Sequence, residues 1–303
     1  MKRSFGLWVL ICFGFGIVSC IDDDGDNSEQ LLAEQTAAID AYLADHATGL
    51  IVNDINGVRM DIHQLGKGLP AKETSNINVK YVGRLFDDNS LFEQGTVDKK
   101  VLNTLIPGWQ IALVSLPEGS KADVYIPSKW AYGPSGQGAI PGNAVLKFEL
   151  EFDKINRSSA ELQKLGTDTI AIDNYLASKS VVAKKDSTGL RYVINTEGTG
   201  PTPTLYDQVS FHVVMKLLTA DDKVVLETDV APSSLNYNRV VDQYADGMKL
   251  GVQKLRKGGK GTFYVPSSLA WGTRGASNAS GQAIIPADAN LIIEIELDDI
   301  GTP

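Results

Sequence analysis

Three short segments combine bulky apolar side chains with turn-forming residues. They are Ile106-Pro107-Gly108-Trp109, Trp130-Ala131-Tyr132-Gly133 and Ala139-Ile140-Pro141. Their spacing allows a Trp, a Tyr and an Ile to meet at the ends of loops or strands around one apolar pocket. No residue in these segments resembles an activated nucleophile or a metal ligand. A site built from them would act through shape and desolvation, which narrows the chemistry that it could perform.

The composition is that of an ordinary globular protein. The chain has 303 residues, enough for about two domains, and is 43% hydrophobic and 21% charged. Its net charge is −9 with only 28 Lys and Arg residues. A nucleic-acid partner would need a basic face, so none is expected. The three His residues are scattered, and the sequence has no P-loop or dinucleotide motif. We therefore expect neither a metal nor a cofactor.

Residues 1–19 are predicted to be a lipoprotein signal peptide. Lys2 and Arg3 precede an uncharged apolar run that is too short to span a bilayer comfortably. The run ends in Ile17-Val18-Ser19-Cys20, which is similar to a bacterial lipobox. In a lipobox the Cys becomes the lipidated first residue of the mature protein, so Cys20 would anchor the protein to a membrane. An ordinary cleaved signal and an uncleaved membrane anchor are the alternatives.

Residues 20–30 are predicted to be an acidic tether, because they contain Asp22-Asp23-Asp24-Gly25-Asp26. An acidic run just after a lipidated Cys is also similar to the surface-export signals of some Gram-negative bacteria. Ile21, rather than Asp, follows Cys20, which argues against retention in the inner membrane. The expected location is the cell envelope, at the outer membrane, facing either the periplasm or the surface.

The chain repeats itself at a period of about 135 residues. Residues 39–44, 127–133 and 139–141 return in the same order as residues 172–177, 266–272 and 284–286. This order indicates a tandem duplication, and the period is too long for a solenoid unit. The predicted domains are residues 31–158 and 159–303.

Each copy begins with apolar residues at helical spacing, over 31–44 and 162–176. Short segments that largely alternate between apolar and polar residues follow in the first copy and indicate strands, whereas residues 109–116 indicate one short helix. The predicted fold class is α+β: two tandem domains, each an antiparallel sheet wrapped on one short helix and preceded by an extra helix. The polar stretch 156–160 joins the two copies.

Five spaced motifs identify the family that the first copy resembles. They are Tyr81-Val82-Gly83, Phe92-Glu93, Leu105-Ile106-Pro107-Gly108-Trp109, Ala131-Tyr132-Gly133 and Ile140-Pro141. In this order they resemble the FKBP-type peptidyl-prolyl isomerases, and the resemblance covers residues 57–155 and 189–301. It implies tandem FKBP-like domains and an isomerase that binds proline-containing polypeptide clients and assists the folding of exported envelope proteins.

The expected chemistry requires no covalent step. An X-Pro bond isomerises slowly because amide resonance imposes a barrier near ~20 kcal/mol. The twisted transition state loses this resonance and has a less polar carbonyl, so a dry apolar pocket favours it over the planar ground state. By resemblance, Trp109 would be the floor of the pocket, and the Ile106 N–H and the Tyr132 hydroxyl would bind substrate carbonyls. The walls would be formed by Tyr81, Phe92, Leu105, Ile140 and Phe148.

Two departures from the family pattern concern the pocket of the first copy. Glu93 stands where the family has Asp, and Lys99-Lys100-Val101 occupies the stretch that usually holds a Phe. One wall is therefore in question, and lower activity or an altered substrate preference is expected. A non-catalytic peptide-binding or chaperone lipoprotein with the same fold is the alternative function.

The second copy departs much further. Only Ile285-Pro286 keeps the family form. Glu227 stays acidic at the position aligned with the family Asp. The aligned positions of the pocket otherwise hold Val213, Met215, Leu226, Met248, Trp271 and Ile293. These apolar replacements are compatible with a packed core but not with an aromatic pocket. The second copy is therefore predicted to be a non-catalytic binding or structural module.

Overall fold

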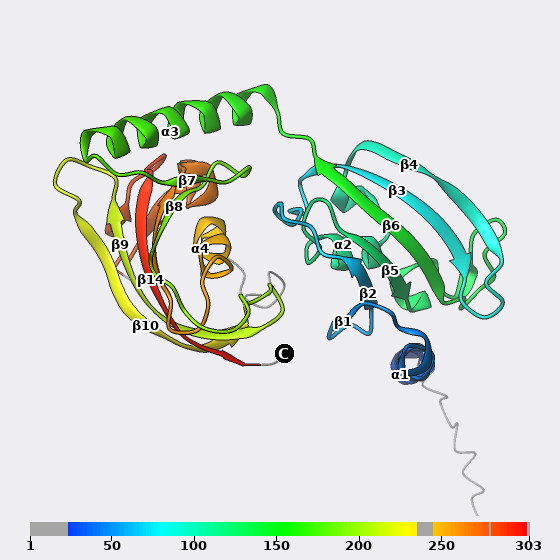
Figure 1. Cartoon of the computed structure of the whole chain (residues 1–303). Helices are drawn as coiled ribbons and strands as arrows, with labels where there is room; N and C mark the ends of the chain where they lie inside the picture. Colours follow the sequence, from blue (N-terminus) through cyan, green and yellow to red (C-terminus); the bar gives the residue numbers. More distant parts are fainter. Residues whose placement is uncertain (1–23, 235–244, 279, 302–303) are drawn as a thin grey trace, which may run out of the picture.

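The chain forms two α+β domains, described here by a computed structural model that covers residues 24–234, 245–278 and 280–301. Each domain is a curved sheet around one short helix, α2 in the first and α4 in the second (Figure 1). The first domain contains α1 (Asp24–His46), β1 (Leu50–Asn53), β2 (Arg59–Gln64), β3 (Asn76–Leu85), β4 (Leu91–Val101), η1 (Leu102–Thr104), α2 (Pro107–Leu113), β5 (Lys121–Ile126), η2 (Ser128–Trp130), η3 (Gly133–Ser135) and β6 (Leu146–Ile155).

The second domain repeats this order of elements. It contains α3 (Ser159–Ser178), β7 (Lys184–Lys185), β8 (Arg191–Thr196), β9 (Gln208–Leu217), β10 (Val224–Ser234), α4 (Asp246–Val252), β11 (Lys260–Val265), η4 (Ser267–Leu269), η5 (Gly272–Arg274), β12 (Ala276–Ser277), β13 (Ala283–Ile285) and β14 (Leu291–Gly301). The strand orders of the large sheets are β1-β2-β5-β6-β3-β4 and β10-β9-β14-β11-β8-β7. The two orders are the same when the second is read from its other edge. The shared topology agrees with the duplication that the sequence indicates.

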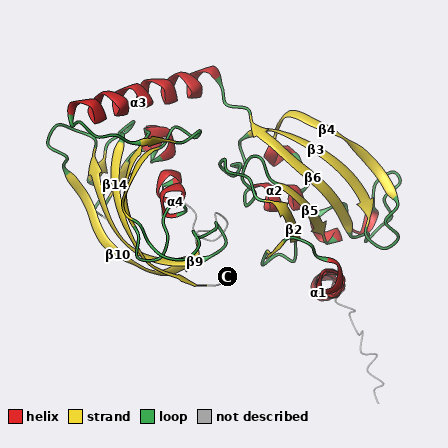
Figure 2. Ribbon diagram, viewed as in Figure 1, coloured by secondary structure: helices red, strands yellow, loops and turns green. Residues whose placement is uncertain are grey.

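The short helix of each domain lies on the concave side of its sheet (Figure 2), and the core includes residues of both the sheet and the helix. Along β6, alternate residues point inward, and Leu146, Phe148, Leu150 and Phe152 are all buried. This alternation follows from the two-residue period of a strand. The helix α2 packs closely in the hollow because Gly108 has no side chain: a Cβ there would lie 2.3 Å from Ile126 Cγ2. Close packing at Gly108 places the next residue, Trp109, inside the core.

The leading helices pack on the other face of each sheet. Ile39 and Leu43 of α1 form a separate buried cluster with Tyr125 and Val145, and Arg59 Nε donates to Asp40 Oδ1 at 2.6 Å. In the second domain α3 does the same: its residues pack on Tyr264 and Ile292, and Arg191 Nε donates to Asp173 Oδ1 at 2.9 Å. Each helix is therefore an integral part of its domain.

Three helices begin earlier than the sequence predicts, among them α3, which starts at Ser159 rather than at 162. The first, predicted over 31–44, starts at Asp24, so the second half of the predicted acidic tether is helical. Apolar periodicity marks the middle of a helix rather than its ends, so it does not reveal this start. The short helix α2 starts at Pro107 rather than at Trp109, because proline is well suited to the first helical position. The predicted signal peptide, 1–19, and Cys20 lie outside the described residues.

The two domains contact each other through a small apolar and polar interface. Leu69 of the first domain packs in the second core, and Tyr206 of the second packs in the first core. The Tyr206 hydroxyl donates to the Ser115 carbonyl at 3.0 Å. Burial raises the pKa of Tyr206 above the ordinary tyrosine value.

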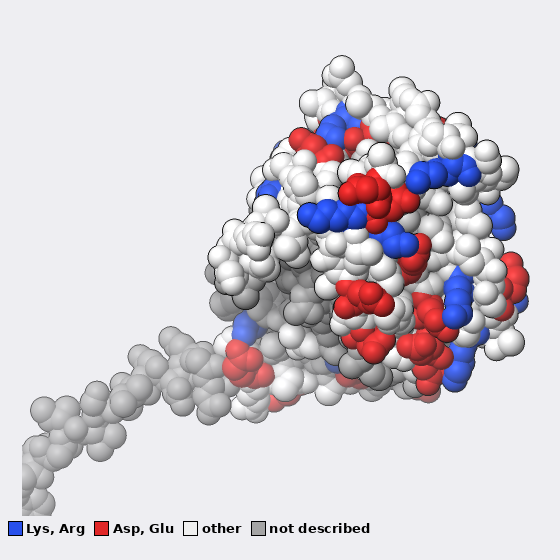
Figure 3. Space-filling view, turned by 90° about the vertical axis from the view of Figure 1, so that its left-hand side faces the viewer, with Lys and Arg blue, Asp and Glu red and all other residues white. Residues whose placement is uncertain are grey.

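Charged side chains of both signs mix on the surface. Figure 3 shows Lys and Arg beside Asp and Glu on one face of the molecule. Ion pairs between such groups include Lys216–Glu294, at 2.5 Å, and Lys260–Glu296, at 2.8 Å. Among the described residues, no helix is both long and apolar enough to cross a membrane.

Candidate functional site

Trp109 is the centre of a cluster of aromatic rings above α2. Its side chain is 4% exposed. The rings of Tyr81 and Phe148 meet it edge to face, at centroid distances of 5.3 and 5.4 Å and interplanar angles of 79° and 88°. Such edge-to-face pairs are favourable for aromatic rings and resist reorientation in a packed site. The indole of Trp109 is therefore held in place by β3 and β6.

A bulge in β4 and a glycine in β3 admit the next aromatic wall. Gly83 pairs with Glu93 and Arg84 pairs with Leu91, so Phe92 is the extra residue of the bulge. The Phe92 ring then lies edge to face with Phe148 at 5.6 Å. A Cβ on Gly83 would lie 2.6 Å from Phe92 Cζ. The Tyr81-Val82-Gly83 motif thus provides both an aromatic side chain and the space for Phe92.

Glu93, Tyr81 and Tyr132 form the polar part of the site. Burial, a hydrogen bond to Glu93 and the negative charge of Glu93 raise the pKa of Tyr81 to about 12. Burial and the Glu93 charge also raise the pKa of Tyr132. Both hydroxyls remain protonated at neutral pH and can donate hydrogen bonds. Glu93 is longer than the Asp that the resemblance implies at this position, and its carboxylate hydrogen-bonds the Tyr81 hydroxyl.

Ile106 caps α2 with extended backbone geometry, φ −58° and ψ 145°. Its carbonyl accepts from the Trp109 and Gln110 N–H groups at 3.0 and 3.3 Å. Within the described residues, its own N–H donates no hydrogen bond. Pro107 follows at the first helical position and stabilises this turn. The site thus combines an available backbone donor with the apolar walls of Leu105 and Ile106, both partly buried on the core.

The segment from Ser128 to Asn143, called here the 128–143 loop, supplies Tyr132 and Ile140. Trp130 Nε1 donates to the Asn56 carbonyl at 2.7 Å, and the Asn143 N–H donates to the Gly133 carbonyl at 2.8 Å. Ile140 is 8% exposed and joins the same core as Trp109. The loop is therefore fixed at several points around the two residues that face the site.

All the apolar and aromatic residues that the sequence nominates lie in one cluster. Trp109, Ile140 and Phe148 are buried in it, and the others pack against it while partly exposed: Tyr81, Phe92, Leu105, Ile106 and Tyr132. Among the described residues, Trp109 Nε1 is the buried side-chain polar atom without a hydrogen-bond partner. The arrangement is an apolar and aromatic cluster with a few hydrogen-bond donors.

The stretch Lys99-Lys100-Val101 does not rebuild the missing aromatic wall. Lys99 and Lys100 are exposed, and Lys99 has a positive φ of 50°. The Lys99 N–H donates to Asn78 Oδ1 at 3.0 Å, which fixes a second bulge in β4. Val97, two residues before Lys99, packs on the core instead. The bulge between Val97 and Lys100 changes which residues of this stretch face the core, and the sequence motif does not reveal it.

The second domain has a different interior at the equivalent place. Met215 is 2% exposed and Met248 is 1% exposed, so both fill the core where the first domain has Gly83 and Trp109. Trp271 is partly buried against the same core. Met215 thus places a side chain at the position where Gly83 leaves room for Phe92 in the first domain.

The strand register corrects one detail of the predicted alignment. Met215 pairs with Leu226 and Lys216 pairs with Val224, so Val225 is the bulge residue and matches Phe92. Leu226, aligned with Phe92 by sequence, instead matches Glu93. Glu227 pairs with Val214, and its carboxylate lies 3.7 Å from His212 Nε2 on the outward side of the sheet. The inner carboxylate is therefore lost in the second domain, whereas the sequence alignment predicts that it is kept.

The sheet topology and the helix in its hollow define an α+β domain of the FKBP type. The family model of the FKBP-type peptidyl-prolyl cis-trans isomerases matches residues 68–153 and 200–298. The chain belongs to this family, and both halves contribute to the match. The predicted fold class and family are confirmed.

Several FKBP-type isomerases are similar to part of this chain. The FKBP-type peptidyl-prolyl cis-trans isomerase FkpA of Aeromonas hydrophila is 37% identical over 109 residues, which cover 35% of this chain and 41% of that protein. The FKBP-type 22 kDa peptidyl-prolyl cis-trans isomerase of Escherichia coli K12 is 35% identical over 119 residues, covering 38% of this chain and 58% of the relative. The crystal structure of FkpA from Escherichia coli aligns with a TM-score of 0.34 and 24% identity, over 48% of this chain and 64% of that one. The chain thus spans about half of each curated relative or less.

Proposed function

We propose that the first domain is a peptidyl-prolyl cis-trans isomerase. The observation that carries this proposal is the packing of Tyr81 and Phe148 around Trp109, with the Ile106 N–H available beside them. Membership of the isomerase family supports it. The second domain, with Met215 and Met248 filling its interior, is a binding or structural module.

The rate enhancement arises from differential solvation and from hydrogen bonding. A prolyl ring on the Trp109 indole places the X-Pro amide in a site of low polarity, where the planar and more polar ground state is poorly solvated. The twisted transition state has a less polar carbonyl and loses less on entering the site. No proton transfer or covalent bond is required.

Two donors hold the substrate backbone. The Ile106 N–H and the Tyr132 hydroxyl are placed to donate hydrogen bonds to substrate carbonyls, and Tyr132 is protonated at neutral pH because its pKa is raised above the ordinary tyrosine value of about 10. Each such hydrogen bond contributes about 1 kcal/mol to binding or to the transition state. They orient the peptide while the aromatic walls exclude water.

The clients are proline-containing polypeptides of the cell envelope. The lipobox-like sequence that ends at Cys20 supports a lipid anchor, and Ile21 after it supports the outer membrane. An anchored isomerase would act on exported proteins as they fold. The second function worth testing is a pure peptide-binding or chaperone lipoprotein, favoured by the exposed Lys99 and Lys100 at one wall of the pocket.

A matched pair of substitutions separates the two functions. Tyr132→Phe removes the loop hydroxyl of the first domain, and Trp271→Phe alters the equivalent loop position of the second. In a proline-peptide isomerisation assay on the full chain, we expect Tyr132→Phe to lower kcat/KM about five- to tenfold, since one hydrogen bond is lost, and Trp271→Phe to leave it unchanged. A wild-type chain that binds the peptide but does not accelerate isomerisation would support the binding module instead.

A further inference from the structure

Gln35, in the leading helix α1, holds both ends of the 128–143 loop. The N–H and Oγ of Ser128 donate to Gln35 Oε1 at 2.8 and 3.0 Å. Gln35 Nε2 donates to the Asn143 carbonyl at 2.8 Å. One amide side chain therefore joins two points of the chain that are 15 residues apart in sequence and enclose Tyr132 and Ile140.

The Ser128 end of this connection is protected from water, whereas Asn143 at the other end is exposed. Gln35 is 8% exposed and Ser128 is 3% exposed. Hydrogen bonds in such surroundings are stronger than at the surface, and a buried amide that lost its partners would cost about 1–3 kcal/mol. By fixing both ends of the loop, the side chain also limits the conformations available to the residues between them.

Helix α1 is anchored independently of Gln35. Ile39 is fully buried and Leu43 is 5% exposed, both in the cluster with Tyr125. Asp40 accepts from Arg59 Nε at 2.6 Å and from its Nη2 at 3.1 Å. The position of Gln35 is thus set by the sheet, and it transmits that position to the loop. Helix α1 precedes residues 68–153, the first segment matched by the family model.

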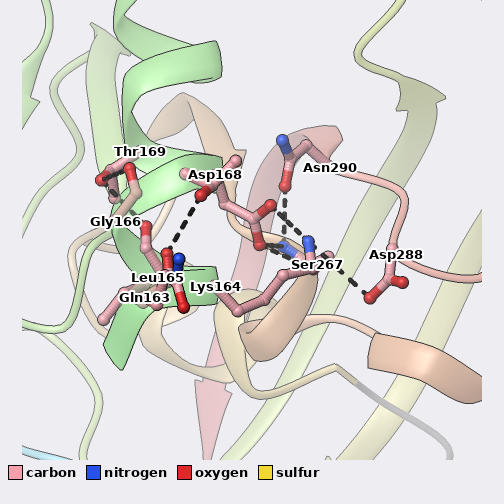
Figure 4. A network of polar contacts seen from close by, with 10 residues as sticks. Gln163, Lys164, Leu165, Gly166, Asp168, Thr169, Ser267, Asp288 and Asn290 are labelled. Carbon is pink, nitrogen blue, oxygen red and sulfur yellow. Dashed lines mark hydrogen bonds and ion pairs between the residues drawn. The ribbon is translucent and has the colours of Figure 1, made fainter. Parts of the chain in front are cut away.

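The second domain builds the same connection from different side chains (Figure 4). Asp168 of α3 accepts from the Ser267 N–H at 3.1 Å and from its Oγ at 2.6 Å. Asn290 Oδ1 accepts from the same N–H at 2.8 Å, and Lys164 Nζ lies 3.7 Å from Asp288 Oδ1. The far end of the loop is therefore reached by Lys164 and Asn290, because an aspartate cannot donate.

The loops of both domains end in the same turn, although different side chains connect them to the leading helix. Asn143 and Asp288 both have positive φ, 61° and 57°. Their N–H groups donate to the Gly133 and Gly272 carbonyls, each at 2.8 Å. Two different sets of side chains that preserve one loop conformation indicate that the leading helix serves to fix this loop.

We propose that Gln35 is a positioning residue of the isomerase site, which sets the place of the Tyr132 hydroxyl by holding both ends of the 128–143 loop. This inference rests on the proposed isomerase function. It makes α1 a required part of the active domain, although its residues do not touch substrate.

The test compares Gln35→Ala and the volume-keeping Gln35→Met with Asp40→Asn in the full chain. Asp40→Asn weakens another anchor of the same helix without touching the loop. We expect both Gln35 variants to lower kcat/KM about tenfold, since small misplacements of a binding group are costly, and Asp40→Asn to change it less than about twofold. In a Tyr132→Phe background the loss from Gln35→Ala should shrink to less than about threefold. A full tenfold loss in that background would overturn the proposal.

Hydrogen exchange gives a readout that does not depend on activity. The N–H groups of Ala131 and Asn143 are bonded within the loop, to the Ser128 and Gly133 carbonyls at 3.0 and 2.8 Å. We expect them to exchange about tenfold faster in both Gln35 variants and at the wild-type rate in Asp40→Asn. Unchanged exchange in the Gln35 variants would overturn the role of Gln35. An inactive wild type in which the exchange still responds would overturn the isomerase function alone.

Discussion

Gly83 and Phe92 are complementary: a Cβ on Gly83 would lie 2.6 Å from Phe92 Cζ and 2.9 Å from Phe148 Cε1. Because Gly83 of β3 has no side chain, the bulge of β4 can place the Phe92 ring in the site. In the second domain Met215 takes the place of Gly83, and the bulge residue is Val225. The residue in the third strand and the bulge residue facing it therefore differ together between the two domains, because the two side chains compete for the same space.

Gly83→Ala is expected to displace Phe92 and lower both stability and isomerase activity. The added methyl group overpacks a buried site, at a cost of about 1–3 kcal/mol in the free energy of unfolding. Gly95→Ala is the matched control, because its Cβ would have no neighbour closer than Tyr81 Cε1 at 3.6 Å. Urea unfolding and the peptide assay measure both effects. Equal behaviour of the two variants would show that Gly83 does not provide the space for Phe92.

The stability of the fold should decline in strongly alkaline solution. The pKa of Tyr81 is raised to about 12, and those of Tyr125 and Tyr175 are also raised, so the folded state holds these protons more tightly than the unfolded state. Their contribution is fully present below the unfolded tyrosine pKa of about 10 and is lost as the pH rises through the folded values. Urea unfolding between about pH 8 and 12 should show this decline, and Tyr81→Phe should make it shallower. An equally steep decline in Tyr81→Phe would contradict the shift at Tyr81.

Cys20→Ser tests the lipid anchor. In a Gram-negative host, the wild-type chain should incorporate labelled palmitate and sediment with membranes, because acyl chains on one terminus bind the bilayer. The Ser variant should incorporate no label and leave the outer-membrane fraction. A wild type that is unlabelled and soluble would indicate an ordinary cleaved signal. Unlabelled but membrane-bound protein in both cases would indicate an uncleaved anchor.

Tyr206→Phe is expected to weaken the contact between the domains. The hydroxyl of Tyr206 donates to the Ser115 carbonyl in a buried setting, and its loss should lower the free energy of unfolding by about 1 kcal/mol. Tyr192→Phe is a suitable control, because Tyr192 stacks on Phe263 at 6.1 Å and its hydroxyl donates no hydrogen bond within the described residues. Urea midpoints that fall equally in both variants would argue against a specific role for the Tyr206 hydroxyl.

Much of the site could be predicted from sequence because its residues belong to short motifs in a fixed order. Tyr81, Trp109 and Tyr132 could be nominated this way, and the fold places them together. The register of the second domain could not be predicted from the motif spacing, because the hairpin between Lys216 and Val224 is one residue longer than the one between Arg84 and Leu91. The role of Gln35 could not be predicted either, because it is one polar residue in a helix and its hydrogen-bond partners lie 93 and 108 residues away in the sequence.

The start of α1 could not be predicted from the sequence either. Asp24 and Gly25 resemble a solvated linker in composition, yet the helix begins at Asp24. Helix ends depend on local dipole and capping interactions worth only about 1 kcal/mol, so apolar periodicity locates the middle of a helix better than its ends.

The most direct test of the account compares Trp109→Leu with Met248→Leu in the full chain. These residues occupy the same position in α2 and α4, and both are buried. The measurement is the rate of cis-trans exchange in a proline peptide at equal concentrations of folded protein. We expect Trp109→Leu to lose nearly all acceleration, about 100-fold or more, since the floor of the pocket is removed, and Met248→Leu to keep the wild-type rate. Retention of the wild-type rate in Trp109→Leu would contradict the assignment of the isomerase activity to the first domain.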